Sequence, residues 1–189
     1  MHSLVQYLRQ SLPSLSEEAE SIVVSTFRKQ TKKKGDRLVV QGEVCKYLYF
    51  LTRGISRSYS LREAADITTW FSFANDFITS FTSFFPREPS YEHIEMLTDG
   101  DVFQISYDQL LEIRSNSLEI ERVINHFSLL YTIQLEKRLF LIQTYNAAEK
   151  YEQILEREPH LIQKIPSKYL ASYLGITRET LSRIRSRLN

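Results

Sequence analysis

The sequence predicts an α+β fold, in which helices and an antiparallel β-barrel are followed by a long helix and an all-helical C-terminal region. Three observations support this. From Gly35 to Ser106, short segments rich in Val, Ile, Tyr, Phe and Thr alternate with glycines, as in small all-β bodies. A long run without Gly or Pro follows, from Ser117 to Tyr145. The chain then ends in a basic stretch from Lys164 to Asn189 that has helical spacing.

The composition is that of an ordinary globular protein. The chain has 189 residues, of which 42% are hydrophobic and 25% charged, and this excludes wholesale disorder. No stretch approaches the roughly 18 consecutive apolar residues of a membrane span, and the N-terminus has no apolar signal region. Cys45 is the one cysteine; it excludes an internal disulfide and is expected to be buried and inert. We therefore expect a cytoplasmic protein.

The N-terminal segment predicts helices. Apolar residues recur at three- and four-residue steps over residues 3–30, with a break at Pro13. Ser16 is followed by Glu17 and Glu18, which is typical of a helix cap with acids in the first turn. Lys32–Lys34 end the pattern, and we interpret this lysine run as a solvated loop.

Six strands are expected in the middle of the chain. Gly35, Gly42, Gly54 and Gly100 separate the apolar segments and supply the positive φ that tight turns often require. The Phe-rich stretch 75–90 contains two prolines and predicts a short helix and loop inserted in the barrel. The expected strands are Arg37–Gln41, Cys45–Thr52, Ile55–Leu61, Ile67–Phe73, Tyr91–Thr98 and Val102–Ser106.

The long helix predicted over 117–145 has apolar residues on more than one stripe. At about 1.5 Å per residue it would be about 40 Å long, which exceeds a small barrel. The second apolar stripe must be buried against another surface. The same helix of a second copy of the chain is the simplest such surface. The alternative is a helix packed wholly within its own chain.

Charge separates the two ends of the chain. Residues 164–189 hold six basic residues and one acid, a net charge of +5, whereas the rest has 18 basic and 22 acidic residues, a net charge of −4. A basic end on an acidic body favours nucleic-acid binding. We place a domain boundary near residue 146, between 1–145 and 146–189, with a helix over Ala147–Arg157.

The segment Ile165–Leu188 has the pattern of a helix-turn-helix. Ser167 can cap a first helix over Lys168–Leu174, Gly175 ends it, and Thr177 caps the second helix. The apolar and small positions that complete the pattern are Leu170, Ala171, Leu174, Ile176, Leu181 and Ile184.

The second helix has two faces. Leu181, Ile184 and Leu188 are expected to face the domain. The N-terminal end of this helix enters the major groove in such motifs, where Arg can bond guanine and Glu can accept from cytosine. Glu179 also suits the first helical turn and can pair with Arg183. We assign base contacts to Arg178, Glu179, Ser182 and Arg183, and phosphate contacts to Ser167, Lys168, Thr177, Arg185 and Arg187.

A barrel, a long helix and a helix-turn-helix containing ITRETLSRIR together resemble the Crp/Fnr family of bacterial transcription regulators. Gly35, Gly42–Glu43, Tyr47 and Gly54 resemble the turns of that family's β-roll, and NDFITSF resembles its cassette. The resemblance implies a jelly-roll-like β-roll sensor domain with flanking helices, a dimerisation helix at about 117–145, and a homodimer on a near-palindromic DNA site. It also implies that Arg178, Glu179 and Arg183 contact bases. Family members often have a β-hairpin wing after the recognition helix; only Leu188 and Asn189 follow here, so no wing is expected.

The sequence departs from the cyclic-nucleotide-binding members. Those members hold the ribose with a Gly-Glu pair and the cyclic phosphate with an Arg-Ser or Arg-Thr pair. Thr79–Ser80 and Ser90–Tyr91 stand at these places, so the acid and the arginine are missing and the pocket is degenerate. Arg87 lies nearby, but an arginine in a loop between prolines is expected to be solvated. No response to cyclic AMP is expected.

The cassette is also unusually apolar. It contains Phe77, Phe81, Phe84 and Phe85. One interpretation is core packing that closes a lost pocket; the other is a pocket for an apolar ligand.

No cofactor or enzymatic chemistry is indicated. His2, His93, His126 and His160 lack metal-ligand spacing, and no phosphate loop or nucleophile motif is present. A haem sensor stays conceivable, though no pair of axial ligands is marked. The predicted function is a dimeric DNA-binding transcription regulator, with RNA polymerase as a further candidate partner and an unknown effector. The alternative is a ligand-binding or protein-interaction module that no longer binds DNA.

Overall fold

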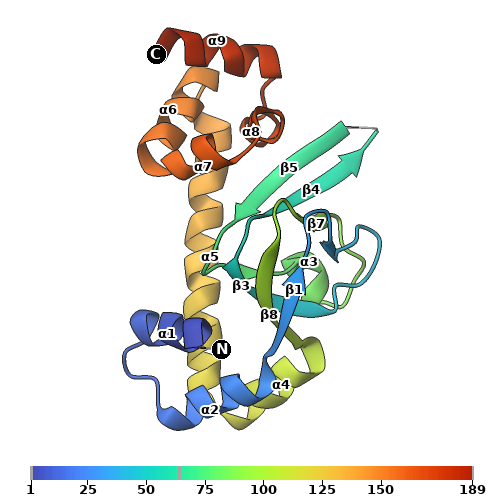
Figure 1. The fold of residues 1–189 in the computed structure, drawn as a ribbon, viewed down its shortest axis with the longest axis vertical. Coiled ribbons are helices and arrows are strands. Elements are labelled where there is room, and N and C mark those ends of the chain that lie inside the picture. Colours follow the sequence, from blue (N-terminus) through green and yellow to red (C-terminus); the bar gives the residue numbers. More distant parts are fainter. Residues whose placement is uncertain (1, 64, 189) are drawn as a thin grey trace. The chain divides into compact units, whose positions relative to one another are not determined.

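The computed structural model describes residues 2–63 and 65–188, in two compact units. The first unit comprises Met1–Ser60 and Trp70–Phe127, and the second comprises Leu61–Thr69 and Ser128–Asn189. Figure 1 shows the order of the elements along the chain. We describe each unit by itself.

The first unit begins with two short helices, α1 (His2–Ser11) and α2 (Glu17–Thr26). Pro13 lies between them, and the Ser16 hydroxyl accepts a hydrogen bond from the Ala19 N–H at 3.2 Å, which confirms the predicted break and cap. The helical prediction is wrong after α2, because strand β1 (Arg28–Lys32) follows. The predicted lysine loop begins one residue too early, since Lys32 is the last residue of this strand.

Strand β1 was missed because only pairing creates it. Its side chains are polar and mostly exposed, so the strand has no alternating apolar pattern. Its backbone pairs with β8, from Arg28 opposite Gln104 to Lys32 opposite Gly100. A charged edge strand of this kind protects a sheet from pairing with other chains.

Two four-stranded sheets form the β-roll. Their strand orders are β1-β8-β3-β6 and β2-β7-β4-β5, and each of the six predicted strands is present. The two-residue β6 was not expected; it exists through its pairing with β3. The further strands are β2 (Arg37–Val39), β3 (Tyr47–Arg53), β4 (Ser56–Arg62), β5 (Ala65–Ser72), β6 (Phe77–Ile78), β7 (His93–Met96) and β8 (Gly100–Ser106).

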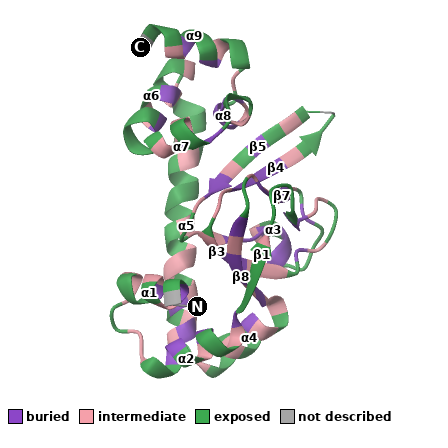
Figure 2. Cartoon of the chain, viewed as in Figure 1, coloured by how far each residue is buried: buried purple, intermediate pink, exposed green. Residues whose placement is uncertain are grey.

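The core of the first unit joins both sheets and the N-terminal helices. Leu4 and Leu8 of α1 belong to the same buried cluster as strand residues. Figure 2 shows that buried stretches alternate with exposed ones along the strands of the roll. Burying a large aliphatic or aromatic side chain stabilises a fold by roughly 1.5–3 kcal/mol. The fully buried strand residues include Phe50, Leu51, Ile94, Met96, Val102 and Ile105.

Two glycines permit a close approach of strands at one end of the roll. A Cβ added to Gly100 would lie 2.2 Å from the Arg53 carbonyl oxygen, and Gly54 has a φ of +110°. Glycine is needed at Gly100 because of the close contact with the Arg53 carbonyl oxygen, and at Gly54 because of the positive φ. A side chain at Gly100 would therefore separate β3 from β8.

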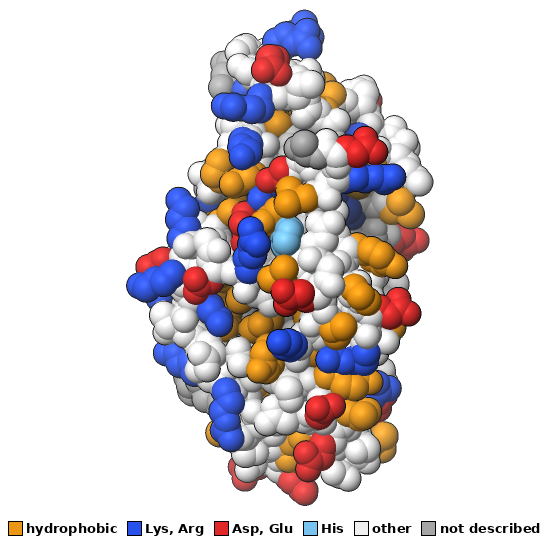
Figure 3. All heavy atoms as spheres, turned by 90° about the vertical axis from the view of Figure 1, so that its right-hand side faces the viewer, with side chains coloured by type: hydrophobic (Ala, Val, Ile, Leu, Met, Phe, Trp, Pro, Cys, Tyr) orange, Lys and Arg blue, Asp and Glu red, His pale blue; other side chains and the backbone are white. Residues whose placement is uncertain are grey.

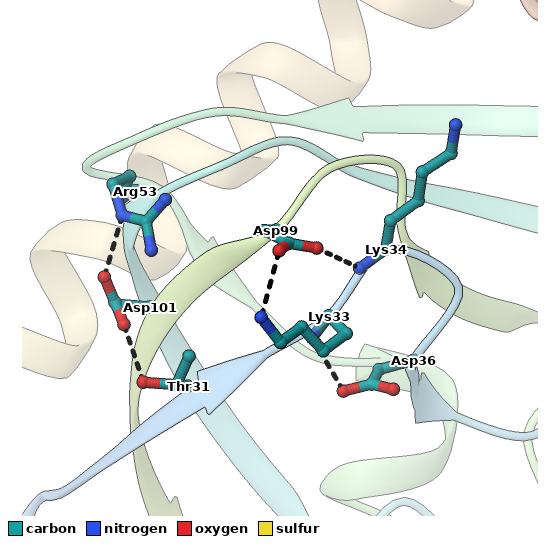
Figure 4. A network of polar contacts seen from close by, with 7 residues as sticks. All are labelled: Thr31, Lys33, Lys34, Asp36, Arg53, Asp99 and Asp101. Carbon is teal, nitrogen blue, oxygen red and sulfur yellow. Dashed lines mark hydrogen bonds and ion pairs between the residues drawn. The ribbon is translucent and has the colours of Figure 1, made fainter.

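Ion pairs and hydrogen bonds connect the turns at this end (Figure 4). Asp99 accepts from the Lys34 N–H at 2.9 Å and from Lys33 Nζ at 3.2 Å. Asp101 accepts from Arg53 Nε and from Thr31 Oγ1, each at 2.8 Å. These bonds hold the pKa of Asp99 and of Asp101 below the ordinary value, mainly through the hydrogen bonds with Lys34 and Arg53 respectively.

Three further helices lie in the first unit or begin there. The predicted insertion contains α3 (Phe81–Phe84), and α4 (Tyr107–Asn116) follows β8. The long helix α5 spans Leu118–Thr144 without a break (Figure 1). Its first part is anchored in the roll, because Ile120 and Val123 are buried in the core cluster.

The second unit contains the helices after α5. They are α6 (Ala147–Arg157), α7 (Pro159–Lys164), α8 (Ser167–Leu174) and α9 (Arg178–Leu188). The helical run is interrupted between α6 and α7, and Pro159 begins α7, since proline suits the first helical position. No helix of the described chain is long and apolar enough to cross a membrane.

Candidate functional site

The turn between α8 and α9 has helix-turn-helix geometry. Gly175 is left-handed at φ 68°, and its N–H bonds the carbonyls of Ala171 and Ser172. The Thr177 hydroxyl accepts from the Thr180 N–H at 3.1 Å and so caps α9. The predicted helix stop and second cap are confirmed. The predicted first cap is not: Ser167 is already helical, and Pro166 stands at the cap position.

One face of each helix is buried in the second unit. Leu181 and Ile184 of α9 pack toward the interior, as predicted, while the side chain of Leu188 lies outside the described part. The interior explains why α8 and α9 hold one orientation relative to each other. The buried residues from α6 to α9 are Tyr151, Ile154, Leu161, Ile165, Leu170, Ala171, Tyr173, Leu174, Leu181 and Ile184.

The residues predicted to contact bases lie together on the exposed face of α9. Arg178, Glu179, Ser182 and Arg183 are all exposed. Arg183 Nη2 donates to the Thr180 hydroxyl at 3.2 Å, which braces a long side chain near the N-terminal end. The face therefore presents two guanidinium groups, one carboxylate and one hydroxyl to solvent.

Glu179 is held in its anionic form. The pKa of its carboxyl is lowered, first by its own backbone N–H at the start of the helix, then by the Thr177 hydroxyl and the Arg178 charge. An anion at this end also suits the helix dipole. A hydrogen-bond acceptor is thus available on a surface that is otherwise basic.

The predicted phosphate contacts divide into two groups. Lys168, Thr177 and Arg187 are exposed. Ser167 and Arg185 instead bond each other, since Arg185 Nη1 donates to the Ser167 hydroxyl at 2.7 Å. The Arg185 guanidinium also lies 5.8 Å from the centre of the Tyr151 ring. Arg185 therefore joins α9 to α8 and α6, a contact that the charge pattern did not predict.

The structure brings two of the predicted pocket residues of the first unit, Ser80 and Ser90, into contact. Ser90 Oγ donates to Ser80 Oγ at 3.0 Å, and both side chains are buried. The Thr79 hydroxyl donates to the Tyr47 carbonyl at 3.2 Å. Tyr91, by contrast, is 69% exposed. The two serines that stand at the places where the resemblance implies an acid and an arginine thus bond each other.

Arg87 is exposed, as its loop position predicts, and its guanidinium also bonds the backbone. Its Nη1 donates to the Cys45 carbonyl at 2.7 Å and to the Phe84 carbonyl at 3.2 Å. Its guanidinium lies 4.6 Å from the centre of the Tyr107 ring. The backbone of Arg87 is left-handed, with a φ of +60°, and the bonds of its side chain hold the loop in this conformation. Cys45 is buried, as predicted.

The phenylalanines of the cassette pack on other aromatic rings. Phe77 lies 5.0 Å from Phe50 and 4.8 Å from Phe127, and Phe84 lies 5.5 Å from Tyr107. Such tilted and edge-on pairs are favourable in cores. This geometry favours core packing over a pocket for an apolar ligand.

A buried ion pair in the roll had no counterpart in the sequence pattern. Arg57 is 2% exposed; its Nη2 lies 2.7 Å from Glu95 Oε1, and its guanidinium stacks 4.0 Å from the Tyr59 ring centre. Next to Tyr59, His93 Nδ1 accepts the Gln41 N–H at 3.0 Å. Burial lowers the pKa of His93, with a smaller contribution from the Arg37 charge.

The surface charges and the candidate metal ligands bear on which ligands the protein could bind. On the face drawn in Figure 3, basic, acidic and hydrophobic side chains are interspersed. Among the described residues, no group of His, Cys, Asp and Glu could hold a metal ion.

The comparisons with known proteins agree with this fold. Residues 29–117 match the family of cyclic nucleotide-binding domains. FixK2 from Bradyrhizobium japonicum is 21% identical, with a TM-score of 0.71 over 86% of this chain and 84% of that one. A transcriptional regulator of the Crp/Fnr family from Eubacterium rectale is 20% identical, with a TM-score of 0.72 over 93% and 84%.

The c-di-GMP responsive global regulator CLP from Xanthomonas campestris is 13% identical, with a TM-score of 0.71 over 92% of this chain and 91% of that one. No protein of curated function matches the sequence significantly. The match over residues 29–117 and the fold shared with these solved structures bear out the resemblance to Crp/Fnr regulators that the sequence predicts.

Proposed function

We propose that the protein is a Crp/Fnr-type transcription regulator that binds double-stranded DNA as a homodimer in the bacterial cytoplasm. The observation that carries the proposal is the exposed face of α9, where Arg178, Glu179, Ser182 and Arg183 lie opposite the buried Leu181 and Ile184. A helix anchored on one side with charged donors and an acceptor on the other suits the major groove. RNA polymerase is a further proposed partner.

The second half of α5 supports the dimer. Leu129 is 61% exposed and Phe140 56% exposed, and both share an exposed helix face with Ile133. Apolar side chains at such spacing are buried when two identical helices pair about a two-fold axis. We keep the proposed domain boundary at residues 145 and 146, between the helix that pairs and the helices that bind DNA. Sedimentation of the full chain at micromolar concentration should find a dimer; a monomer both with and without DNA would contradict it.

Base and phosphate contacts can be separated experimentally. We assign Arg183 to a base edge, and Arg187 to the phosphate backbone together with Lys168 and Thr177. Arg183→Ala should cost about 1–3 kcal/mol per half-site and relax the preference at one position. Arg187→Ala removes the same charge but should weaken binding evenly across sequences and reduce the salt dependence.

Selection from random DNA at two salt concentrations measures this contrast. The two variants are matched controls for each other because both are exposed arginines of one helix. Equal losses with an unchanged site preference would show that Arg183 contacts phosphate.

We propose further that DNA binding does not depend on cyclic AMP. A cyclic phosphate would lose its charged partner, since the buried Ser80 and Ser90 bond each other at the place of the acid and the arginine. Calorimetry should detect no saturable micromolar site for cyclic AMP or cyclic GMP, and such a site would disprove the proposal.

A further inference from the structure

Arg138 connects the long helix α5 to helix α8 within the second unit. Its guanidinium lies 3.5 Å from the centre of the Tyr173 ring, and its Nη2 donates to the Tyr173 carbonyl oxygen. Tyr173 is itself only 7% exposed. One side chain of α5 thus makes both a stacking contact and a hydrogen bond to the first helix of the helix-turn-helix.

The chemistry of this contact is specific to an arginine. The Tyr173 carbonyl belongs to the last turn of α8, where carbonyl groups lack helical partners and attract cations. Arg138 Nε and Nη1 are buried with no hydrogen-bond partner in the described part of the chain. Burial lowers the pKa of Arg138, while the nearby Tyr173 and Glu158 oppose this. A partly desolvated guanidinium thus lies against the last turn of α8.

The neighbouring residue of α8 is fixed as well. The Ser172 hydroxyl accepts the Thr68 N–H and donates to the Asp66 carbonyl, both at 2.9 Å. These partners lie in Leu61–Thr69, which belongs to the same compact unit. Two successive residues of α8 are therefore held from outside the helix-turn-helix.

The contacts leave the DNA-binding face free. Arg178, Glu179 and Arg183 stay exposed while Ser172 and Tyr173 are engaged, so the contacts do not mask the surface that we propose reads DNA. The segment of α5 that carries Arg138 also carries the exposed apolar residues Leu129 and Phe140. Between α5 and α6 the chain has only Tyr145 and Asn146, and Asn146 caps α6.

We propose that Arg138 is a positioning residue that sets the separation of the two recognition helices, and with it the spacing between DNA half-sites that the dimer accepts. This rests on the proposed function. In a two-fold dimer, the orientation of α8 and α9 relative to α5 decides where each α9 enters the groove. Each inserted base pair moves the half-sites by about 3.4 Å and rotates them by about 35°, so a rigid dimer discriminates between spacings.

The test measures the affinity of the 189-residue chain for its selected site and for sites with one base pair inserted or removed between the half-sites. The wild type should prefer the native spacing by about tenfold or more. Arg138→Met, which keeps side-chain bulk, should reduce this preference to about threefold or less while the base preference within each half-site stays unchanged. Arg138→Lys keeps the charge without the planar stacking group and should restore the preference in part.

Lys137→Ala is the matched control, because Lys137 is the exposed neighbour of Arg138 on α5; it should keep the wild-type spacing preference. A general loss of folding would lower affinity for every spacing alike. If Arg138→Met does not fold, the spacing preference of Arg138→Lys is used to test the inference. Wild-type spacing preference in the folded variants overturns the inference, whereas a wild type that binds no specific DNA contradicts the proposed function instead.

Discussion

The interior of the β-roll and the outer face of α9 use polar residues in opposite ways. In the roll, Ser80 and Ser90 bond each other, and Arg57 pairs with Glu95. On α9, Arg178 and Glu179 extend into solvent. The buried groups satisfy one another, whereas the exposed groups leave their hydrogen-bonding capacity for a partner.

This difference distinguishes polar groups that stabilise the fold from polar groups that are available to bind a ligand. Burial of a polar group without a hydrogen-bond partner destabilises the folded state. The interior of a closed pocket is therefore stable when its buried donors and acceptors bond one another. Exposed charges carry no such penalty and contribute little to stability. We therefore expect changes in the roll interior to alter folding and changes on α9 to alter recognition.

The largest expected effect is the loss of a buried partner. Glu95→Ala removes the carboxylate that lies 2.7 Å from the Arg57 guanidinium, whose residue is 2% exposed, and should lower the free energy of unfolding by about 3–5 kcal/mol. Lys33→Ala breaks a pair whose side chains are 74% and 52% exposed, and should cost no more than about 1 kcal/mol. Urea denaturation of both variants measures the contrast; equal costs would mean that Arg57 is effectively hydrated.

A smaller effect concerns pH. Burial lowers the pKa of His93 in the folded protein, so the unfolded chain binds its proton at higher pH, near about 6.5. The stabilisation is therefore complete above about pH 6.5 and is lost as the pH falls through the lower folded pKa. His93→Asn offers a neutral acceptor to the Gln41 N–H and should flatten the fall in melting temperature below pH 6.5. His126→Asn is the control and should leave it unchanged; a fall that persists in His93→Asn would assign it to other groups.

The smallest effect on stability is expected on α9. Glu179→Gln should change the free energy of unfolding by no more than about 0.5–1 kcal/mol, since it removes one charge from the first turn of a helix. It should nevertheless change the preferred base at one position of the half-site. Denaturation and binding selection on the same sample test both parts, and an unchanged preference would make Glu179 only a favourable charge at the helix end.

Much of the fold follows from local pattern. The strands were predicted because their apolar residues and turn glycines are visible along the chain, and the helix-turn-helix because Gly175 and Thr177 mark its turn. Strand β1 was missed, since Arg28 and Lys29 have no apolar alternation and become a strand only by pairing with β8. Within the candidate site, exposure of Arg178, Glu179 and Arg183 could be expected from the helical period, but the bond between Ser167 and Arg185 could not.

The class of fold, the apolar face of α9 and the absence of an acid and an arginine at Ser80 and Ser90 can all be predicted from the order of the residues. These properties depend on residue type and near-neighbour spacing, which the chain displays directly. Tertiary structure alone decided that Arg57 is buried with Glu95 and that Arg138 stacks on Tyr173. The physical reason is that a long cationic side chain is compatible with solvent or with an interior. Its fate depends on which distant carboxylate, ring or carbonyl the folded chain brings within reach.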